Sequence, residues 1–564
     1  MSLQLLRPAT HAAVFSAIRP SARRLSSPRS PVLQPALARL LIPATAAFRS
    51  FTPAFPTMAP KATPSKRART EATAAGNGAE APPKMKADPA EAERMLQFIN
   101  KAWTAYHAVD EAAKRLTAAG YTRISERDEW KLQPGGRYFF TRNQSTIVAF
   151  AVGAKYKPGN GFYIVGAHTD SPCLKLKPVS KYHKTKHTMV NVEPYGGGLW
   201  ATWFDRDLTV AGRVLVRQAD GTIAHRLVKV DRPLMRIPML AIHLNREIMT
   251  DGFNINAQNH LSPVLATSIK DALNAESDKG ENHHGSALLN VLAEELGCDT
   301  KDIFDLELNV CDTQPGVIGG VHNEFVWVGR LDNLAMSYCS LAALLDTTSE
   351  EALAEEVGVR AVALFDHEEV GSSSAQGAGG PVMLDTIKRV ATVLGEQQEG
   401  VVVRALQRSF LVSADMAHAL HPNYVDKHDP EHQPLFHQGI VIKHNQNQRY
   451  STNAVSAGLF RELGKRNGIP VQEFAIRSDL ACGSTIGPIL SSSMGVRTVD
   501  VGAPQLSMHS IREMMGVDDV SYTVAHFKAF FAEFSKMDAI IDVDGLAPPD
   551  IKGTIDDVPC GHVH

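Results

Sequence analysis

The sequence is poor in cysteine and nearly balanced in charge. Its six cysteines are scattered through 564 residues without a C-x-x-C pair, which favours reduced thiols in a cytosolic or organellar compartment over a disulfide framework. The net charge of −2 gives no indication of a nucleic-acid-binding protein. The chain also lacks a G-x-x-x-x-G-K-[ST] loop, a G-x-G-x-x-G after a strand and a G-x-S-x-G elbow. Nucleotide binding and serine-nucleophile chemistry are therefore without support.

Residues 1–57 contain no Asp, Glu or Lys, but seven Arg. This composition is typical of a mitochondrial or plastid transit peptide, and Arg and Pro interrupt its apolar runs well before they reach membrane length. Met58 begins a polar, Ala/Pro-rich stretch, 58–87, that we expect to be a disordered linker, although its "KRAR" is also compatible with a nuclear signal. We expect a cytoplasmic product from Met58 and mitochondrial or other organellar import of a product from Met1.

From residue 88 onward, apolar strand-like runs alternate with helical segments, which predicts a layered α/β fold. Asp88-Pro89-Ala90-Glu91 provides capping residues for a helix that we expect to end at Gly120. "STIVAFAVG" (145–153) and "GFYIVGAHTD" (161–170) are separated by a turn-rich segment and predict a hairpin. Further strands are expected at 359–365, 409–415, 471–476 and 496–502, and further helices at 331–346, 451–467 and 520–536.

Residues 179–303 interrupt this alternation. They contain basic, His-rich turns such as "SKYHKTKHT" and the segment "PYGGGLWATWFDRDLTVAGRVLVR". We interpret them as a separate, mostly β domain inserted into the α/β domain. The α/β domain is then formed from 88–178 and 304–545, and a tail occupies 546–564.

Acidic and histidine residues stand where the apolar runs end, or shortly after them. The set comprises His168, Asp170, Asp332, Glu368, Glu369, Asp415 and His509. In an open α/β sheet, ligands bind in the crevice beyond the carboxyl ends of the strands, so these segments are expected to converge there. Taken singly, a His or Asp at the end of a strand is more often a turn or capping residue than a catalytic one. Taken together, they suggest a metal site, because burying several carboxylates is costly unless cations compensate them.

The types of residue in this set indicate which metals to expect. Two histidines with three or four carboxylates and no cysteine suit two zinc ions, with cobalt or manganese as alternatives. A shared carboxylate would bridge ions roughly 3.5–4 Å apart. The H-x-D spacing places Asp170 where it can orient the imidazole of His168. "DHEEVG" lacks the second histidine of H-E-x-x-H, so a helix-borne zincin site is not indicated.

Seven motifs, in one order from about residue 89 to 540, resemble those of the aspartyl aminopeptidases, a family of di-zinc exopeptidases. They are "GAHTDSPCLKLKP", "GRLDN", "FDHEEVGSSSAQGA", "SADMAHALHPNY", "NQRYSTN", "ACGSTIGPIL" and "MHSIRE". The resemblance implies a mixed-sheet zinc-exopeptidase domain. It also implies that 179–303 is a dimerisation domain and that dimers assemble into dodecamers.

The resemblance further implies a role for each site residue. The metal ligands would be His168, Asp332, Glu369, Asp415 and His509, with Asp332 bridging the two ions. Glu368 takes the general-base position, and Asp170 that of the acid orienting His168. Lys443, with Tyr450 beside it, takes the position that selects an acidic substrate side chain, and His243 that of a histidine contributed by a neighbouring subunit.

Spacing alone would make Lys443 a surface lysine, whereas the surrounding motif favours a role in specificity. A cation in a partly dry pocket attracts a carboxylate and is left unpaired by a neutral side chain.

The expected function is removal of N-terminal Asp, and less readily Glu, from peptides, through metal-activated water with Glu368 as the base. The expected partners are such peptides and further copies of the chain, without nucleic acid or membrane. A broader di-zinc aminopeptidase and an N-acyl amino-acid deacylase are alternatives. A non-catalytic scaffold of the same fold is a third, although the sequence retains every expected ligand and the base.

Overall fold

The computed structural model describes residues 83–274, 283–395, 399–539 and 541. The expected leader at 1–57, most of the linker at 58–87 and the tail at 546–564 lie outside these residues. Within the described ranges, each helix is too short or too polar to cross a lipid bilayer. The five cysteines in these ranges are free thiols.

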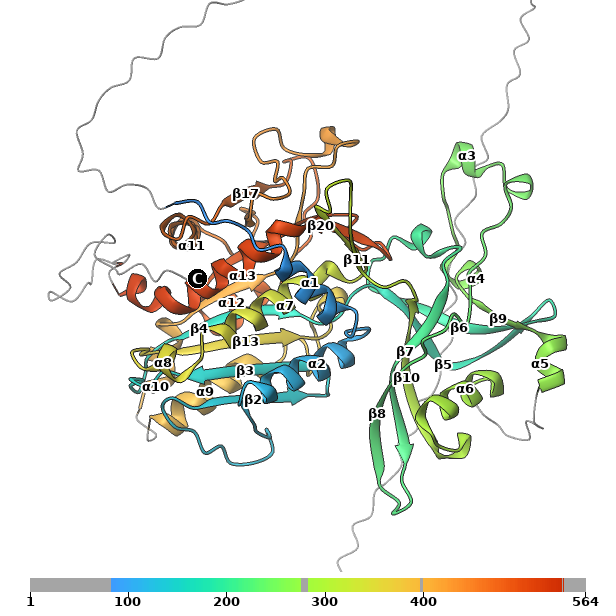
Figure 1. Ribbon diagram of the computed structural model, residues 1–564, viewed down its shortest axis with the longest axis horizontal. Helices are drawn as coiled ribbons and strands as arrows, with labels where there is room; N and C mark the ends of the chain where they lie inside the picture. The colour runs from blue at the N-terminus through green and yellow to red at the C-terminus, as the bar shows by residue number, and fades with distance from the viewer. Residues whose placement is uncertain (1–82, 275–282, 396–398, 540, 542–564) are drawn as a thin grey trace, which may run out of the picture. The chain divides into compact units, whose positions relative to one another are not determined.

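The largest sheet has nine strands and forms the centre of the α/β domain (Figure 1). Its spatial order is β1 (Thr122–Arg123), β2 (Arg137–Arg142), β3 (Thr146–Val152), β13 (Val359–Phe365), β4 (Phe162–His168), β14 (Phe410–Ala414), β18 (Arg497–Gly502), β16 (Ile440–His444) and β17 (Val471–Ala475). The four central strands β13, β4, β14 and β18 are parallel neighbours. Their carboxyl ends therefore meet at one edge of the sheet, where ligands bind in folds of this class.

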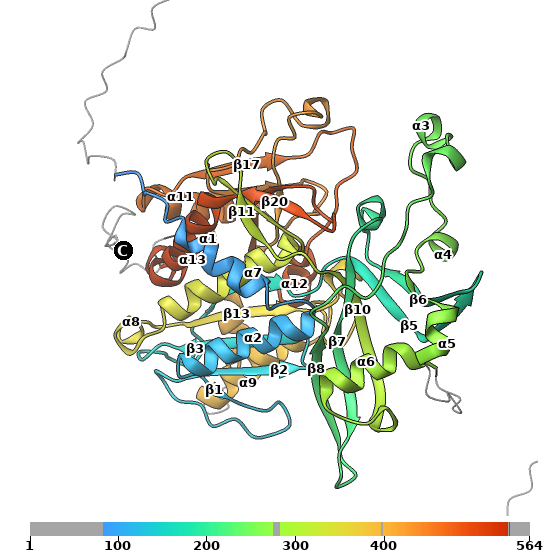
Figure 2. The same ribbon diagram turned by 45° about the vertical axis from the view of Figure 1, so that its right-hand side comes forward.

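Helices cover both faces of this sheet, which confirms the layered α/β prediction. One face packs against α1 (Ala90–Ile99), α2 (Ala105–Ala118), α7 (Leu331–Asp346), α11 (Ala454–Arg466) and α13 (Val517–Asp538), and the other against α9 (Val382–Leu394), α10 (Val401–Gln407) and α12 (Ile486–Met494). Figure 2 shows α1, α2 and α7 in front of the strands. Alternate residues of β4 serve the two cores: Tyr163 and Val165 face one, Phe162 and Ile164 the other. Both faces are covered, which explains why these strands are apolar throughout.

The later strands and helices lie where the sequence predicts them, but the hairpin prediction is wrong. Strand β13 lies between β3 and β4, antiparallel to the first and parallel to the second. All seven residues of β13 are buried, so it needs a neighbour along each edge and a helix layer on each face. Strand β3 instead forms its hairpin with β2, a strand absent from the prediction.

The single helix expected from Asp88 to Gly120 is two helices, α1 and α2. The chain leaves the helical path after α1, and Thr104, in an extended conformation, caps α2 by accepting a hydrogen bond from the backbone N–H of His107. The expected start is close to that observed, since Asp88 accepts a hydrogen bond from the backbone N–H of Ala90 at 3.1 Å.

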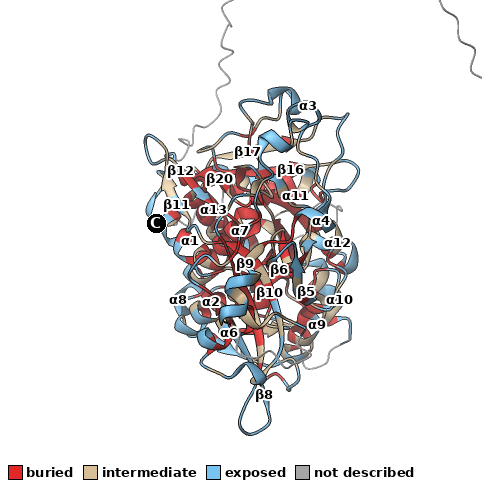
Figure 3. Cartoon of the chain, turned by 90° about the vertical axis from the view of Figure 1, so that its right-hand side faces the viewer, coloured by how far each residue is buried: buried red, intermediate tan, exposed pale blue. Residues whose placement is uncertain are grey.

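The second sheet is formed from the predicted insertion, 179–303, and from residues on either side of it. It has its own apolar core, which includes Leu174, Val210 and Leu308. Its order is β8 (Ile223–Lys229), β7 (Leu208–Arg217), β10 (Ile303–Asp312), β5 (Cys173–Lys184), β6 (His187–Tyr195) and β9 (Val264–Thr267). Short helices accompany it: α3 (Ile248–Asp251), α4 (Ala257–His260), α5 (Ser268–Asn274), α6 (Ser286–Leu296), η1 (Trp200–Trp203), η2 (Ile242–Leu244) and η3 (Thr300–Asp302). Figure 3 shows exposed residues on α3 and at the end of β8, and buried ones in α7 and α13. The sheet spans 173–312, and its role in dimerisation stays a prediction.

The third sheet carries two of the expected site segments. Its order is β11 (Val317–Gly319), β12 (Phe325–Val328), β20 (Glu513–Gly516), β19 (Pro504–Leu506) and β15 (Ala417–His418). Asp332 follows β12 closely, and His509 lies in the turn between β19 and β20. The remaining short helices are α8 (Glu350–Leu353), η4 (Glu368–Val370) and η5 (Val425–Lys427).

Candidate metal centre

The candidate metal ligands come from segments far apart in the sequence that meet at the carboxyl edge of the central sheet. His168 is the last residue of β4, and Asp415 directly follows β14. Glu369 lies in η4, just beyond β13, and Asp332 in the first turn of α7. His509 takes a left-handed backbone conformation, with a φ of 68°.

Two triads of side chains share Asp332. In the first, His168 Nε2 lies 3.4 Å from Asp332 Oδ1 and 3.6 Å from Asp415 Oδ1. In the second, His509 Nε2 lies 3.3 Å from Asp332 Oδ2 and 3.4 Å from Glu369 Oε1. Within each triad the candidate ligand atoms all lie within 4.8 Å of one another. The two oxygens of one carboxylate thus face two different histidines.

Glu368 stands beside these triads. Its Oε2 lies 3.9 Å from His168 Nε2, and the two residues form a third triad with Glu369. Burial, supported by the Asp415 and Glu369 carboxylates, raises the pKa of Glu368 to about 8, although His168 opposes the shift. Burial likewise raises the pKa of Glu369 to about 7. The crowding of carboxylates thus makes the fully charged cluster unfavourable without compensating cations.

The histidines respond to the same cluster in the opposite sense. Burial alone would lower their pKa, but the surrounding carboxylates outweigh it. Asp332 and Glu369 raise the pKa of His509 to about 11, and the pKa of His168 lies well above its ordinary value.

The residues present fit zinc. Oδ1 of Asp332 and Oε1 of Glu369 are buried and accept no hydrogen bond within the described residues, and leaving such oxygens unsatisfied is costly. Imidazole nitrogens and carboxylate oxygens are ligands that zinc takes. A divalent cation in each triad would satisfy both oxygens and compensate the excess negative charge.

Asp170 contacts both His168 and the backbone of Glu368 and Glu369. His168 Nδ1 donates to the backbone carbonyl of Asp170 at 3.1 Å, while Oδ1 of the Asp170 carboxylate lies at 3.4 Å from the same nitrogen. The two carboxylate oxygens accept the backbone N–H groups of Glu368 and Glu369, each at 3.1 Å. Asp170 thus contacts His168 through both its backbone and its side chain, and its orienting role stays a prediction.

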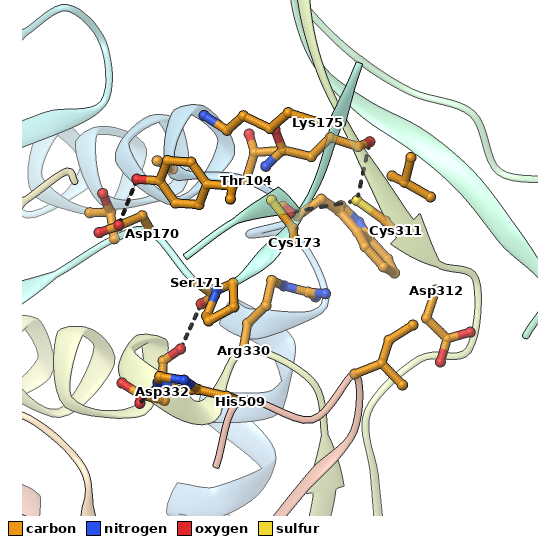
Figure 4. A pocket seen from close by; sticks show the side chains of 18 of the residues that line it. Thr104, Asp170, Ser171, Cys173, Lys175, Cys311, Asp312, Arg330, Asp332 and His509 are labelled. Carbon is orange, nitrogen blue, oxygen red and sulfur yellow. Dashed lines mark hydrogen bonds and ion pairs between the residues drawn. The ribbon is translucent and has the colours of Figure 1, made fainter. Parts of the chain in front are cut away.

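Glu513, the last residue of the "MHSIRE" motif, received no role from the sequence. It is buried on β20, and its carboxylate accepts the backbone N–H of His509 at 2.9 Å and that of Asp332 at 3.2 Å. It therefore connects two of the three segments that supply the second triad, those of Asp332 and His509. The Ser171 hydroxyl also donates a hydrogen bond to the backbone carbonyl of Asp332 at 2.6 Å (Figure 4).

A small cavity of about 50 Å³ lies between these residues and the second sheet. Asp170, Asp332 and His509 line one part of it, and Cys173 and Cys311 of strands β5 and β10 another (Figure 4). Burial raises the pKa of Cys173 to about 12 and that of Cys311 to about 11. In the metal-free chain both thiols therefore stay protonated near neutral pH and are poor nucleophiles.

The candidate specificity residues lie next to Asp415. Lys443 on β16 is buried, which excludes the surface-lysine interpretation. Its Nζ lies 3.5 Å from Asp415 Oδ2, donates to the carbonyl of Met416 at 3.1 Å and stands 5.0 Å from the centre of the Tyr450 ring.

His243 lies apart from this group. It is exposed in η2, and among the described residues it makes no hydrogen bond or ion pair with the candidate ligands. Its predicted contribution to a neighbouring subunit's site stays a prediction.

The sequence matches the model of a known protein family and several curated proteins. The family model described as aminopeptidase I zinc metalloprotease (M18) matches residues 98–531. A probable aspartyl aminopeptidase of Ricinus communis is 58% identical over 475 residues, which cover 80% of this chain and 96% of the relative. The aspartyl aminopeptidase of Dictyostelium discoideum is 48% identical, with 80% and 98% covered.

Solved structures agree with this match. The structure titled as the Ape4 and Nbr1 complex contains a chain with a TM-score of 0.79 and 43% identity, covering 81% of this chain and 88% of that one. The mApe1 dodecamer of S. cerevisiae gives a TM-score of 0.70 and 30% identity, with 79% and 98% covered.

Proposed function

The chain belongs to the aminopeptidase I zinc metalloprotease (M18) family, and from this premise we propose that it removes N-terminal Asp, and less readily Glu, from peptides. The observation that carries the proposal is the Asp332 carboxylate, which faces His168 with one oxygen and His509 with the other. The aspartyl aminopeptidase activity named for the relatives above supports the choice of substrate.

The proposed metal content is two zinc ions per subunit, with cobalt or manganese as substitutes. His168 and Asp415 would hold one ion, Glu369 and His509 the other, and Asp332 would bridge them. When bound, zinc activates water as a nucleophile and polarises the carbonyl that is attacked.

Glu368 is proposed as the general base. It belongs to neither of the two triads that share Asp332. Its carboxylate nevertheless lies 3.9 Å from His168 Nε2. Asp170 fixes the backbone of Glu368 through the N–H that it accepts, which holds the carboxylate towards the centre. The carboxylate takes a proton from the attacking water and returns it to the nitrogen of the leaving amine.

Lys443 is proposed to select the acidic side chain. Its ammonium group is buried, and Asp415 is its only ion-pair partner among the described residues. If Asp415 binds a cation, the charge of Lys443 is left to attract a carboxylate of the substrate, and a neutral side chain would leave it unpaired.

We further propose that the chain forms a homo-oligomer, a dodecamer built from dimers, in which His243 reaches a neighbouring site. The Ape1 structure titled as a dodecamer supports this proposal. We also propose a cytoplasmic location for a product that starts at Met58 and organellar import for one that starts at Met1, on the composition of residues 1–57.

The variant Glu368→Gln tests the base. It keeps the size of the side chain but removes its basicity, so kcat for an Asp-terminated peptide is expected to fall roughly 10²–10⁴-fold, while zinc content measured by elemental analysis stays that of the wild type. Glu355→Gln, at an exposed glutamate that pairs with Lys155, is the control and should change neither value. Full activity of Glu368→Gln would exclude Glu368 as the base.

The alternative functions are separated by a substrate panel. Peptides that begin with Asp, Glu or Leu and an N-acyl aspartate are compared at equal zinc loading. Preference for the Leu peptide would indicate a broader aminopeptidase, and preference for the N-acyl substrate a deacylase. Absence of turnover with zinc bound would indicate a scaffold.

A further inference from the structure

The second sheet reaches into the metal centre through one short segment. Residues 195–199 lead from the end of β6 towards η1 and have the sequence Tyr-Gly-Gly-Gly-Leu. We refer to them as the 195–199 segment. Its members contact Asp170, which lies against His168, and His509 itself, although the segment contains no candidate ligand.

On the His168 side, the contact is made by a tyrosine hydroxyl. Tyr195 donates to Asp170 Oδ2 at 2.7 Å. The same carboxylate accepts the backbone N–H groups of Glu368 and Glu369. Tyr195 therefore restrains the one residue that holds both the imidazole of His168 and the loop carrying the two glutamates. The ring of Tyr195 is itself held in place by Lys175, whose Nζ lies 4.1 Å from its centre.

On the His509 side, the contacts are made by the backbone. His509 Nδ1 donates to the carbonyl of Gly197 at 2.8 Å, and the carbonyl of His509 accepts the N–H of Leu199 at 2.9 Å. A donated N–H fixes the tautomer of a ligating imidazole and the direction of its other nitrogen. Here that nitrogen, Nε2, faces Asp332 and Glu369.

Gly196 packs closely against Glu369, and a side chain at this position would crowd it. Its φ is 71°, and a Cβ atom there would lie 3.2 Å from Glu369 Cβ and 3.3 Å from the Glu369 carbonyl oxygen. The neighbouring Gly197 has no atom within 4 Å of such a Cβ. The backbone of the segment thus packs directly on one candidate ligand while it hydrogen-bonds another.

We infer that the 195–199 segment is a positioning element through which the second sheet sets the geometry of the metal centre. Tyr195, through Asp170, and Gly197, through His509, each fix the orientation of one histidine, and Gly196 fixes the backbone of Glu369. The inference rests on the proposed zinc site and goes beyond it, because it makes zinc affinity depend on the second sheet, which supplies no candidate ligand among the described residues.

Tyr195→Phe tests the His168 side without altering the backbone. The full chain is stripped with a chelator, dialysed and titrated with zinc in a calorimeter. Loss of the hydroxyl is expected to weaken zinc binding at one site of the pair by about 10-fold or more and to lower kcat more than it raises KM. The control is Tyr182→Phe on β5 of the same sheet, whose hydroxyl makes no hydrogen bond within the described residues.

Gly196 and Gly221 provide a matched pair for the backbone contact with Glu369. Gly196→Ala is expected to weaken zinc binding, because the added Cβ would crowd Glu369. Gly221→Ala controls for strain alone, since Gly221 has a φ of 84° and open space around its Cβ position. Thermal unfolding of the zinc-free proteins separates loss of fold from loss of zinc binding.

The outcomes distinguish this inference from the proposed function. A stripped wild-type chain that binds no zinc would refute the zinc site itself. Wild-type zinc binding together with unchanged affinity in both Tyr195→Phe and Gly196→Ala would refute the positioning role alone. Weaker binding in these two variants, with wild-type affinity in Tyr182→Phe and Gly221→Ala, is the expected result.

Discussion

At the scale of single residues, two adjacent glutamates in "DHEEVG" occupy different environments. Glu369 faces His509 and packs against the 195–199 segment, with one buried oxygen left without a hydrogen bond within the described residues. Glu368 instead lies beside His168, with its Oε2 3.9 Å from His168 Nε2, and burial raises its pKa. The backbone separates the two roles, because η4 begins after a left-handed residue, His367, and turns the two side chains towards different histidines.

Lys443→Leu tests specificity at this scale. The apolar substitute removes the buried ammonium group, so kcat/KM for an Asp-terminated peptide is expected to fall by about 10²-fold or more, since losing a charged pair in a dry site costs roughly 3–5 kcal/mol. Activity towards a Leu-terminated peptide should be unchanged or rise. Tyr450 and Asp415 remain in place, and zinc content serves as the control. A variant that kept the full preference for Asp would show that another residue reads the acidic side chain.

At the scale of elements, the candidate ligands lie at or near the ends of strands, and the helices pack on the sheet that carries those strands. Helix α13 is the longest contributor to one core, and it packs on α7, α11 and α1. At its centre, His526 stacks on Phe460 of α11 with ring centres 3.9 Å apart, and its Nε2 donates to the Phe460 carbonyl at 2.9 Å. Complete burial lowers the pKa of this imidazole to about 4.

His526 makes the α11–α13 contact sensitive to acid. Its folded-state pKa lies below the ordinary 6.5, so the unfolded chain binds more protons between these values and stability falls as the pH falls. From pH 7 to pH 5 this group should remove about 2 kcal/mol from the free energy of unfolding. His526→Gln keeps a donor for the carbonyl but does not titrate. Its thermal midpoint should drop less than that of the wild type between the two pH values, and an equal drop would contradict this account.

At the scale of the whole molecule, the short helices between β8 and β9 present apolar side chains to solvent in the single chain. Leu244 in η2 is 75% exposed and Met249 in α3 is 79% exposed. Two large apolar side chains so exposed within one short stretch of the chain make this stretch a candidate interface. His243 directly precedes Leu244, which is consistent with a role at a subunit boundary.

Leu244→Asp combined with Met249→Asp tests this surface. Two buried charges at an interface are costly, so the assembled mass measured by mass photometry is expected to decrease to that of smaller oligomers. Activity should fall with it if His243 completes a neighbouring site. Val403→Asp, at a residue 63% exposed on α10, is the control and should leave the mass unchanged. An unaltered assembly in the double variant would place the interface elsewhere.

Much of the α/β domain was predictable, because its strands and helices carry strong local signals. Strands β13, β14, β17 and β18 and helices α7, α11 and α13 lie where apolar runs and helical periodicity place them. The pairing of β3 and β4 was not predictable in the same way. Their neighbour β13 is about 200 residues later in the chain, and a local pattern contains no information on which distant strand will come between two adjacent ones.

The sequence by itself determined the chemistry: which residues end the strands, that histidines and carboxylates gather there without cysteine, and that their order matches a family of zinc exopeptidases. Only the tertiary structure decided how these side chains face one another. In it the two oxygens of Asp332 face different histidines. Glu513 accepts hydrogen bonds from the backbone of two candidate ligands. Tyr195 and Gly197, at the end of β6 in the second sheet and just beyond it, contact Asp170 and His509. The physical reason is that residue types follow from the chain one position at a time, whereas distances of 3 Å across segments hundreds of residues apart depend on how whole sheets pack.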